Sequence, residues 1–381
     1  MMEGHRHTQL LPPLHLRSPL KSLQSSSRLL RATSQTMLSS QLRVKTARRI
    51  NKARSAVTPV KTRCDPGKSN HKRFFSTMDV KSKAPAIRCQ WDLQDIAMRK
   101  CIGKGSLGKV MLGEVQGFQV AVKVVGKVPA KVRKTAEAER KVLEELKHQL
   151  IVTYYGSLED QEYIYLVLEY LPKGDLFHLM KRRRLKTKEI RFFAMEVAVA
   201  LKSLHDDNIV YRDLKPENVM LHESGHIRLI DFGFAKKLSS ERTASVLGSP
   251  EYMAPEVVMR KPHGLAVDCW SFGILLFELW TQYFPHSHPP FQGTSPMEVY
   301  EHVLQGLYEL PSFIDTQAKD LIRRLLNPEP RLRPSITSIR AHAYFGDVDW
   351  LLADSVLVVP PALGDSGAIH REHFRTDLFD G

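Results

Sequence analysis

The sequence predicts an α+β fold with two lobes: a small, β-rich N-terminal lobe with one helix, and a larger, mostly helical C-terminal lobe. Two observations favour this fold class. Short β-branched segments separated by glycine-containing turns occupy the chain from Met98 to Glu169, as expected for a sheet. From Asp175 onward, apolar residues recur at helical spacing instead. A sheet-rich part followed by a helix-rich part indicates two lobes with a cleft between them.

The predicted small lobe consists of strands and one charged helix, and we expect ordered structure to begin near Trp91. Residues 131–147 carry many charges and few helix breakers, so they are expected to form the helix. Strands are expected at residues 98–105, 109–114, 118–125, 152–157 and 163–169.

The predicted large lobe begins with a helix for which Thr187 is the expected N-cap. Its apolar positions follow i, i+3, i+4 spacing and are Ile190, Phe193, Ala194, Val197, Leu201 and Leu204. Further helices are expected at residues 265–281, 296–305, 315–326 and 335–341. The densest apolar stretch, Phe272 to Trp280, is shorter than the ~20 residues of a membrane span and contains Glu278. It therefore predicts a buried helix, and we expect no transmembrane segment.

All of the excess positive charge lies near the N-terminus. The chain has 381 residues and a formal net charge of +15, which at first suggests a nucleic-acid partner. Residues 1–85 hold 18 Lys and Arg against three acids, whereas the remainder has 38 basic and 38 acidic residues. We therefore expect no specific nucleic-acid partner for the folded part of the chain.

The basic segment, residues 1–90, lacks sustained periodicity and is expected to be a disordered extension. A solvated tail is the interpretation that we favour. Its Arg- and Ser-rich, acid-poor composition also resembles a mitochondrial transit peptide. A basic arm that adheres to anionic lipid or nucleic acid is the third interpretation.

The four cysteines, at positions 64, 89, 101 and 269, are widely separated and form no CxxC pair. This spacing argues against a zinc site or a disulfide framework and favours a reducing compartment. We expect a cytoplasmic protein, with nuclear or mitochondrial targeting through the basic extension as the alternatives.

A glycine-rich sequence, Gly103-x-Gly105-x-x-Gly108-x-Val110, lies between the first two predicted strands. The same spacing opens a dinucleotide-binding βαβ unit, but a helix follows the glycines there and a strand follows them here. The missing side chains would let a hairpin backbone approach phosphate groups closely. Taken alone, the pattern is also consistent with a plain glycine-rich hairpin turn.

A lysine, Lys123, ends the third predicted strand after three apolar residues. Such a lysine is usually an exposed edge residue, but its distance from the glycine-rich sequence favours contact with phosphate. A carboxylate would have to hold it in place, and the following helix offers Glu137 and Glu139. We favour Glu139 and keep Glu137 as the alternative.

The segment Tyr211-Arg-Asp-Leu-Lys-Pro-Glu-Asn218 carries the groups that phosphoryl transfer requires. That reaction needs a carboxylate to accept the hydroxyl proton, cations near the developing charge, and oxygen ligands for Mg²⁺. Asp213 can supply the base and Lys215 the cation. Asn218, and Asp231 after a largely apolar strand, can supply hard oxygen ligands suited to Mg²⁺. Each residue alone could be a turn former, whereas their joint spacing favours catalysis.

Together these motifs resemble the eukaryotic protein kinases from about Trp91 to about Phe345, and the combined match is highly specific. The resemblance implies the bilobal protein-kinase fold, with an N-lobe over residues 91–168, a C-lobe over 169–345 and a short tail over 346–381. It also implies that Glu256 pairs with Arg333 and that Asp268 braces the loop of residues 211–218. The closest resemblance is to the AGC group, near the cyclic-nucleotide-dependent kinases. It rests on Tyr211 in place of the commoner His and on the sequences of residues 231–236 and 248–252.

The resemblance further implies that the chain is a non-specific serine/threonine protein kinase that uses ATP and Mg²⁺. Lys215 after Asp213 points to Ser and Thr acceptors rather than Tyr, and Leu168 takes the gatekeeper position before the hinge. The ATP-binding residues implied are Ile102, Gly103, Lys104, Gly105, Ser106, Leu107, Gly108, Val110, Ala121, Lys123, Glu139, Glu169, Tyr170 and Met220.

Regulation and substrate preference are implied in the same way. Ser245 falls where an activating phosphate sits, and a phosphate there could pair with Arg212 and Lys236. Three carboxylates match positions at which related kinases bind arginines that precede the acceptor residue of a substrate. They are Asp175, Glu217 and Glu301, and they predict protein substrates with basic motifs. An upstream kinase or a separate regulatory subunit is compatible with the sequence.

Two other classes of protein compete with this interpretation. A pseudokinase scaffold would be favoured by loss of Lys123, Asp213 or Asp231, and none of them is lost. A nucleic-acid or membrane adaptor led by the basic extension is the other, and for it deletion of residues 1–85 should remove salt-sensitive anion binding while peptide phosphorylation survives. The tail departs from the AGC pattern, because Phe374 and Phe379 are five residues apart and form no Phe-x-x-Phe motif.

Overall fold

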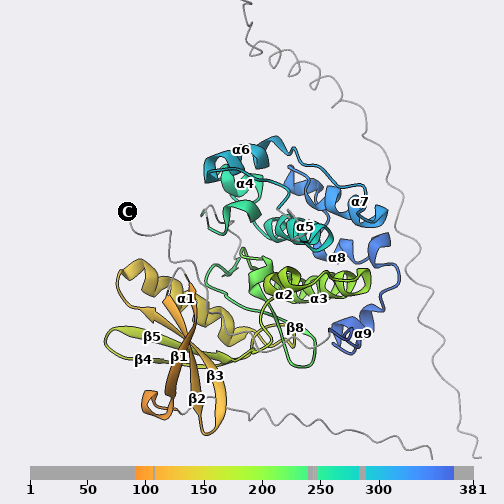
Figure 1. Cartoon of the computed structure of the whole chain (residues 1–381). Coiled ribbons are helices and arrows are strands. Elements are labelled where there is room, and N and C mark those ends of the chain that lie inside the picture. The colour runs from red at the N-terminus through yellow and green to blue at the C-terminus, as the bar shows by residue number, and fades with distance from the viewer. Residues whose placement is uncertain are drawn as a thin grey trace, which may run out of the picture. The chain divides into compact units, whose positions relative to one another are not determined.

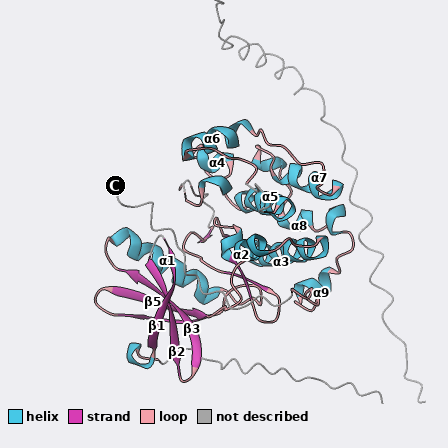
Figure 2. Cartoon of the chain, viewed as in Figure 1, coloured by secondary structure: helices cyan, strands magenta, loops and turns pink. Residues whose placement is uncertain are grey.

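The computed structural model describes residues 91–105, 108–238, 243, 245, 247–282 and 289–363. In this part of the chain, a sheet-based N-lobe adjoins a larger helical C-lobe (Figures 1 and 2). The predicted α+β two-lobe fold is therefore confirmed. The basic extension over residues 1–90 and the end of the tail, residues 364–381, lie outside the described residues. No described helix has both the length and the apolar character needed to cross a membrane.

The N-lobe is built on an antiparallel five-stranded sheet with the order β1-β2-β3-β5-β4. Val120, Val122 and Val124 on β3 pack with Ile96 and Val167 in one apolar cluster. The alternate residues of β3 face the opposite side, where α1 (Ala130–Glu145) contacts the sheet. The strands are β1 (Ala97–Gly105), β2 (Gly108–Val115), β3 (Phe118–Gly126), β4 (Tyr154–Glu159) and β5 (Tyr163–Glu169).

The C-lobe is centred on two long helices, α3 (Thr187–Asp206) and α5 (Ala266–Thr281), which contact each other. Helix α5 is buried along almost its whole length, as its apolar sequence predicts, and the burial includes Glu278. The remaining helices are α2 (Leu176–Arg182), α4 (Pro255–Val258), α6 (Pro296–Gln305), α7 (Thr316–Leu325), α8 (Ile336–Ile339) and α9 (Trp350–Asp354).

The start of α3 differs from the prediction by one residue. Lys186 is the N-cap and Thr187 is already the first helical residue. Glu189 satisfies this end, because the Lys186 N–H donates to Glu189 Oε2 at 2.7 Å. The predicted Thr187 cap is therefore wrong, and at this end of the helix the Glu189 carboxylate in the first turn accepts the backbone N–H of the N-cap residue.

Two short antiparallel sheets of two strands each hold the segments that carry the predicted catalytic residues. Strand β6 (Ile209–Val210) pairs with β9 (Lys236–Lys237), and β7 (Val219–Leu221) pairs with β8 (Ile227–Leu229). The loop of residues 211–218 runs between β6 and β7. A backbone hydrogen bond from Ile230 N to Asn218 O at 3.0 Å joins this loop to the residues after β8.

Residues after Phe345 continue to pack on the C-lobe. The Trp350 indole Nε1 donates to Arg340 O at 3.0 Å, and Arg340 forms an ion pair with Asp354 at 2.7 Å. Farther along, Pro360 lies so close to Gly225 that a Cβ on that glycine, at φ +88°, would come within 2.8 Å. The segment of residues 346–363 thus covers the turn between β7 and β8.

Candidate active site

Lys123 on β3 lies between two carboxylates. Its Nζ is 2.7 Å from Glu139 Oε1 and 2.9 Å from Asp231 Oδ1. Burial alone would lower the pKa of this lysine, but the charges and hydrogen bonds of Glu139 and Asp231 outweigh burial and raise it. Lys123 is therefore a fixed cation that links α1 to the residue after β8.

The structure distinguishes the two candidate partners of Lys123. Glu139 is 1% exposed and faces the sheet from α1, whereas Glu137 pairs with Arg133 at 2.8 Å. The Glu137 side chain is 37% exposed, so that pair is a surface contact between neighbouring helical turns. The two glutamates lie two positions apart and thus fall on different faces of the helix.

Asp213 forms a compact hydrogen-bonded group with Asn218 and Lys215. Asn218 Nδ2 donates to Asp213 Oδ2 at 2.7 Å and to Asp213 O at 2.8 Å, and Lys215 Nζ lies 3.3 Å from the carboxylate. Burial raises the pKa of Asp213 to about 6, with a further increase from the charge of Asp231, although Lys215 opposes it. A carboxylate with this pKa can accept a proton near neutral pH.

The loop that carries Asp213 is held by the buried Asp268 of α5. Asp268 accepts hydrogen bonds from Tyr211 N at 2.9 Å and Arg212 N at 2.8 Å, and it also contacts His205 Nε2 at 2.9 Å. Arg212 has φ +67°, a left-handed conformation that costs energy for a residue with a side chain. The paired amide bonds to Asp268 stabilise this turn and so fix the direction of Asp213.

Asp231 follows β8 with φ +60° and points toward Lys123. Burial would raise the pKa of Asp231, but Lys123 and the Gly233 amide outweigh that effect and lower it. Its side chain is 41% exposed, which leaves carboxylate surface for a cation. The Asn218 amide nitrogen is used on Asp213, so its amide oxygen is the atom that can ligate a metal. Two hard oxygen donors of this kind fit Mg²⁺.

The glycine-rich sequence connects β1 and β2 of the N-lobe sheet. Gly108 cannot carry a side chain, because a Cβ there would lie 2.0 Å from Val124 O. Val110 stands opposite both Gly103 and Lys123 in the sheet register. Gly103 is buried, Ile102 is half-buried and Lys104 is exposed. Ser106 and Leu107, at the tip of the predicted loop, lie outside the described residues.

The predicted hinge residue Glu169 turns its side chain away from β3. Its Oε2 accepts hydrogen bonds from Thr153 N at 3.1 Å and from Arg228 Nε at 3.2 Å. Only the backbone of Glu169 therefore remains to face a nucleotide. Ala121 lies opposite Leu168 in the sheet, while Tyr170 and Met220 are half-buried.

The segment before Gly248 contacts the loop through Arg212. Arg212 NH1 donates to Ser245 Oγ at 2.8 Å, and the Ser245 and Thr243 hydroxyl oxygens are 2.9 Å apart. Lys236, the second predicted partner of a phosphate, is exposed on β9, where its backbone pairs with Val210. Thus Arg212 is the cation that the structure brings to Ser245.

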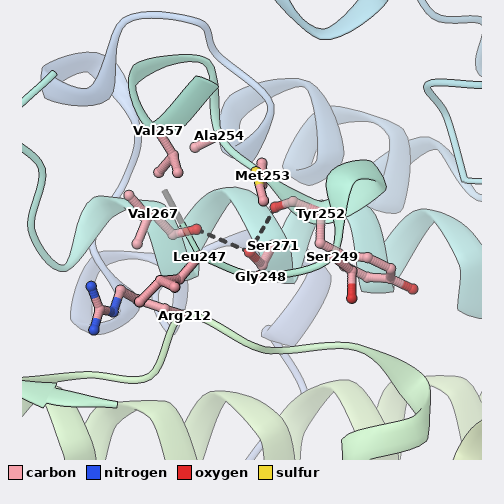
Figure 3. A pocket seen from close by; sticks show the side chains of 10 residues that line it. All are labelled: Arg212, Leu247, Gly248, Ser249, Tyr252, Met253, Ala254, Val257, Val267 and Ser271. Atoms are coloured by element: carbon pink, nitrogen blue, oxygen red, sulfur yellow. Dashed lines mark hydrogen bonds between the residues drawn. The ribbon is translucent and has the colours of Figure 1, made fainter. Parts of the chain in front are cut away.

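A small pocket lies beneath the same segment (Figure 3), lined by Arg212, Met253 and Ser271 among others. Ser271 Oγ donates to Tyr252 O at 3.0 Å and to Val267 O at 3.2 Å, which ties this segment to α5.

Glu256 and Arg333 form the buried ion pair that the resemblance implied. Arg333 NH1 and NH2 each lie 2.7 Å from one Glu256 carboxylate oxygen. The guanidinium also stacks 5.0 Å from the Trp270 ring centroid and donates to Asn327 O at 2.7 Å. This bidentate pair joins the end of the 243–256 segment to the residues after α7.

The three predicted substrate-binding acids do not come together. Asp175 is 1% exposed and serves as the N-cap of α2, where it accepts from His178 N at 2.8 Å. Glu301 is exposed on α6 and does not line the groove that holds Glu217. An arginine of a substrate would therefore have to compete with a helix cap at Asp175.

Glu217 instead shares a groove of ≈ 470 Å³ with two acids that sequence reasoning missed, Glu251 and Glu278. Glu278 comes from the buried helix α5 and accepts a hydrogen bond from the Tyr252 hydroxyl. The groove also includes Lys215, so it adjoins Asp213. The sequence signal for Glu278 is a glutamate within the apolar stretch Phe272–Trp280, a pattern that by itself indicates only a buried helix.

Comparison with known proteins agrees with this geometry. The chain matches the protein kinase domain over residues 96–345. It is 36% identical over 283 residues to the human cAMP-dependent protein kinase catalytic subunit PRKX, covering 71% of this chain and 77% of that protein. The corresponding fungal catalytic subunit, from Arthrobotrys oligospora, is 34% identical over 88% of this chain and 66% of its own length.

The chain therefore belongs to the protein kinase family. Mouse ribosomal protein S6 kinase alpha-6 is a further relative, 39% identical over 70% of this chain and 36% of its own length. The names of these relatives confirm the resemblance to serine/threonine kinases of the AGC group, in particular to the cAMP-dependent catalytic subunits. The chain spans 66% of the fungal relative and 42% of the catalytic subunit from Dictyostelium discoideum.

Proposed function

We propose that this chain is an active serine/threonine protein kinase that transfers the γ-phosphoryl group of ATP to protein hydroxyls. The observation that carries the proposal is the intact pair of charged groups at the cleft. Lys123 is held by Glu139 and Asp231, and Asp213 is held by Asn218 and Lys215. A binding-only scaffold would have no need to keep these six buried or half-buried polar groups in place.

Asp213 acts as the base in this proposal. Its raised pKa of about 6 leaves it mostly ionised at pH 7 yet basic enough to accept the proton of an acceptor hydroxyl. Lys215 lies 3.3 Å from Asp213 and 3.1 Å from Ser249 Oγ. Its ammonium group can therefore stabilise negative charge that develops between the acceptor and the phosphoryl group.

Mg²⁺ and the ATP phosphates would bind beside Asp213 on the side where Asp231 and Asn218 lie, rather than on the side of Ser249. Asp231 and Asn218 would hold the metal, which supplies charge neutralisation on the phosphate oxygens when bound. Lys123 would contact the phosphates and is positioned for this by Glu139 at 2.7 Å. The glycine-rich sequence between β1 and β2 is proposed to cover them, because its glycines let the backbone approach phosphate groups closely.

Basic residues near the acceptor are the proposed substrate feature. Glu217, Glu251 and Glu278 converge on one groove beside Lys215. Carboxylates in such a groove favour guanidinium groups, which can form bidentate hydrogen bonds. We assign this preference to these three acids rather than to the initially predicted set with Asp175 and Glu301.

Phosphorylation of Ser245 is the proposed activation step, through an upstream kinase or another copy of this chain. Arg212 already donates to Ser245 Oγ, so a phosphate there would gain a charge-assisted hydrogen bond. Arg212 precedes Asp213 directly, and the phosphate would therefore restrain the loop that carries the base. A separate regulatory subunit that binds the kinase domain is a second proposed means of control.

A positional-scanning peptide assay with Mg²⁺-ATP tests the function. We expect Ser and Thr peptides with Arg near the acceptor to be phosphorylated, and Asp213→Ala to reduce kcat by about 10³-fold. Wild-type protein without phosphate transfer, or Asp213→Ala with full activity, would contradict the proposal. Activity without any gain from Arg would refute the substrate preference alone.

A further inference from the structure

A row of basic side chains lies beside the acidic groove. Six of the eight residues from 181 to 188 are Lys or Arg. One of them, Arg183, is held by Glu189 at 2.7 Å. The other five are exposed, and we call them the basic ridge: Lys181, Arg182, Arg184, Lys186 and Lys188.

The backbone of the basic ridge is anchored although its side chains are exposed. Leu185 is 4% exposed, and its N–H donates to Gln282 Oε1 at 2.5 Å while Gln282 Nε2 donates back to Leu185 O at 2.9 Å. The Lys186 N–H is held by Glu189. The fold thus presents the exposed charges from a fixed platform.

Phe177 connects the basic ridge to the groove. Lys181 Nζ lies 4.2 Å from the centroid of the Phe177 ring, and that ring lines the groove that contains Glu217, Glu251 and Glu278. Lys181 and Phe177 are one helical turn apart on α2. The surface therefore changes from acidic to basic over a distance that a few residues of extended peptide can span.

We propose that the basic ridge binds an acidic segment of a protein substrate whose basic, acceptor-bearing segment occupies the groove. The inference rests on the proposed kinase function and adds a second recognition element to it. A polyanion of uniform charge fits less well, because nucleic acid or anionic lipid at the ridge would also meet the carboxylates of the groove. A polypeptide with a basic and an acidic segment complements both surfaces.

Two peptides test this surface in the full-length chain. Both carry Arg-Arg-Ala-Ser, and one is extended on each side by Asp and Glu, the other by Ser and Gln, through short Gly linkers. The ridge variant carries Arg182→Glu, Arg184→Glu and Lys188→Glu. The matched control reverses three exposed charges that line no part of the groove, Lys134→Glu, Arg323→Glu and Arg331→Glu. All three proteins keep the basic extension, so its contribution to peptide binding is the same when the variants are compared with wild type.

We expect the ridge variant to raise KM for the acidic peptide about tenfold at low salt, with kcat unchanged and the neutral peptide unaffected. The control variant should behave as wild type. Binding of the labelled peptides, measured by fluorescence anisotropy, separates this inference from catalysis. If no peptide is phosphorylated, the proposed function fails, while the ridge is still judged by the anisotropy.

Equal KM and equal binding of the two peptides in wild-type protein would overturn the inference. So would equal losses in the ridge and control variants. Vesicles containing phosphatidylserine and a short RNA are tested in parallel. If the ridge mutations weaken binding to either one and leave both peptides unchanged, the surface belongs to a lipid or nucleic-acid partner and the proposal is wrong.

Discussion

Lys123 Nζ lies 2.7 Å from Glu139 Oε1, and this contact joins the central strand of the N-lobe sheet to α1. Glu139 is 1% exposed, so it gains little hydration when the lysine is removed. Removing one partner of a buried ion pair leaves the other charge without compensation. We therefore expect a substitution of either Lys123 or Glu139 to disturb the position of the remaining partner.

Glu139→Gln should reduce kcat/KM for ATP by about 10²-fold, because Lys123 would lose the group that positions it toward the phosphates. Steady-state kinetics with saturating peptide measures the effect. Glu137→Gln is the matched control and should retain wild-type kinetics, since Glu137 pairs with Arg133 at the surface. Equal effects of the two substitutions would contradict the assigned pairing.

The pH dependence of kcat/KM should show a group with a pKa of about 6 on the acidic limb. Asp213 must be ionised to accept a proton, and burial raises its pKa to about 6. The rate should thus fall about tenfold for each pH unit below that value. A profile that stays flat from pH 7 to pH 5 would exclude Asp213 as the titrating base.

Asp213→Asn should stabilise the folded protein while removing its activity. A folded-state pKa raised from 3.8 to about 6 means that the carboxylate destabilises the fold above the folded pKa and not below the unfolded pKa. At pH 7.5 the substitution should therefore raise the free energy of unfolding by up to ~3 kcal/mol. Urea denaturation at pH 7.5 and pH 5 measures this, and the gain should be smaller at pH 5.

Glu217→Gln should raise KM for an Arg-containing peptide about tenfold and leave KM for ATP unchanged, because Glu217 lines the groove rather than the nucleotide side. Glu301→Gln is the control and should change neither value. A larger effect at Glu301 than at Glu217 would contradict the assignment of the groove and favour Glu301 as the acid that contacts the substrate arginine.

Removal of residues 1–85 should preserve peptide phosphorylation and abolish salt-sensitive binding to heparin, because the deleted segment carries the whole excess of positive charge. Fluorescent fusions of the full and shortened chains would test the expected cytoplasmic location. Loss of phosphorylation on deletion would show that the segment is required for catalysis.

Much of the fold could be predicted because long, regular segments carry strong periodic signals. The bounds of β5 and α6 agree with the predicted ranges of residues 163–169 and 296–305. Strands of two or three residues, such as β6 and β7, are too short to produce a pattern. Helix α2 was not anticipated, and so Asp175 was not expected to be occupied as a cap.

The site was predictable where function imposes fixed spacing along the chain. Asp213, Lys215 and Asn218 lie within six residues, and the structure brings them together. Residues that are far apart in the sequence but adjacent in the site could not be predicted in this way. Glu278 lies far along the chain from Glu217 and reaches the groove only because α5 passes beneath it. Its neighbours in the sequence are apolar, so the sequence pattern around Glu278 predicts burial and does not indicate that it lines the groove.

The packing of Pro360 against the Gly225 turn bears on how the catalytic part should be produced for study. A fragment that ends at Phe345 would remove Trp350 from its hydrogen bond with Arg340 and uncover the β7–β8 turn. A fragment extended to residue 363 keeps both contacts. Shortened proteins that aggregate or express poorly would then report the loss of this covering segment rather than a defect in catalysis.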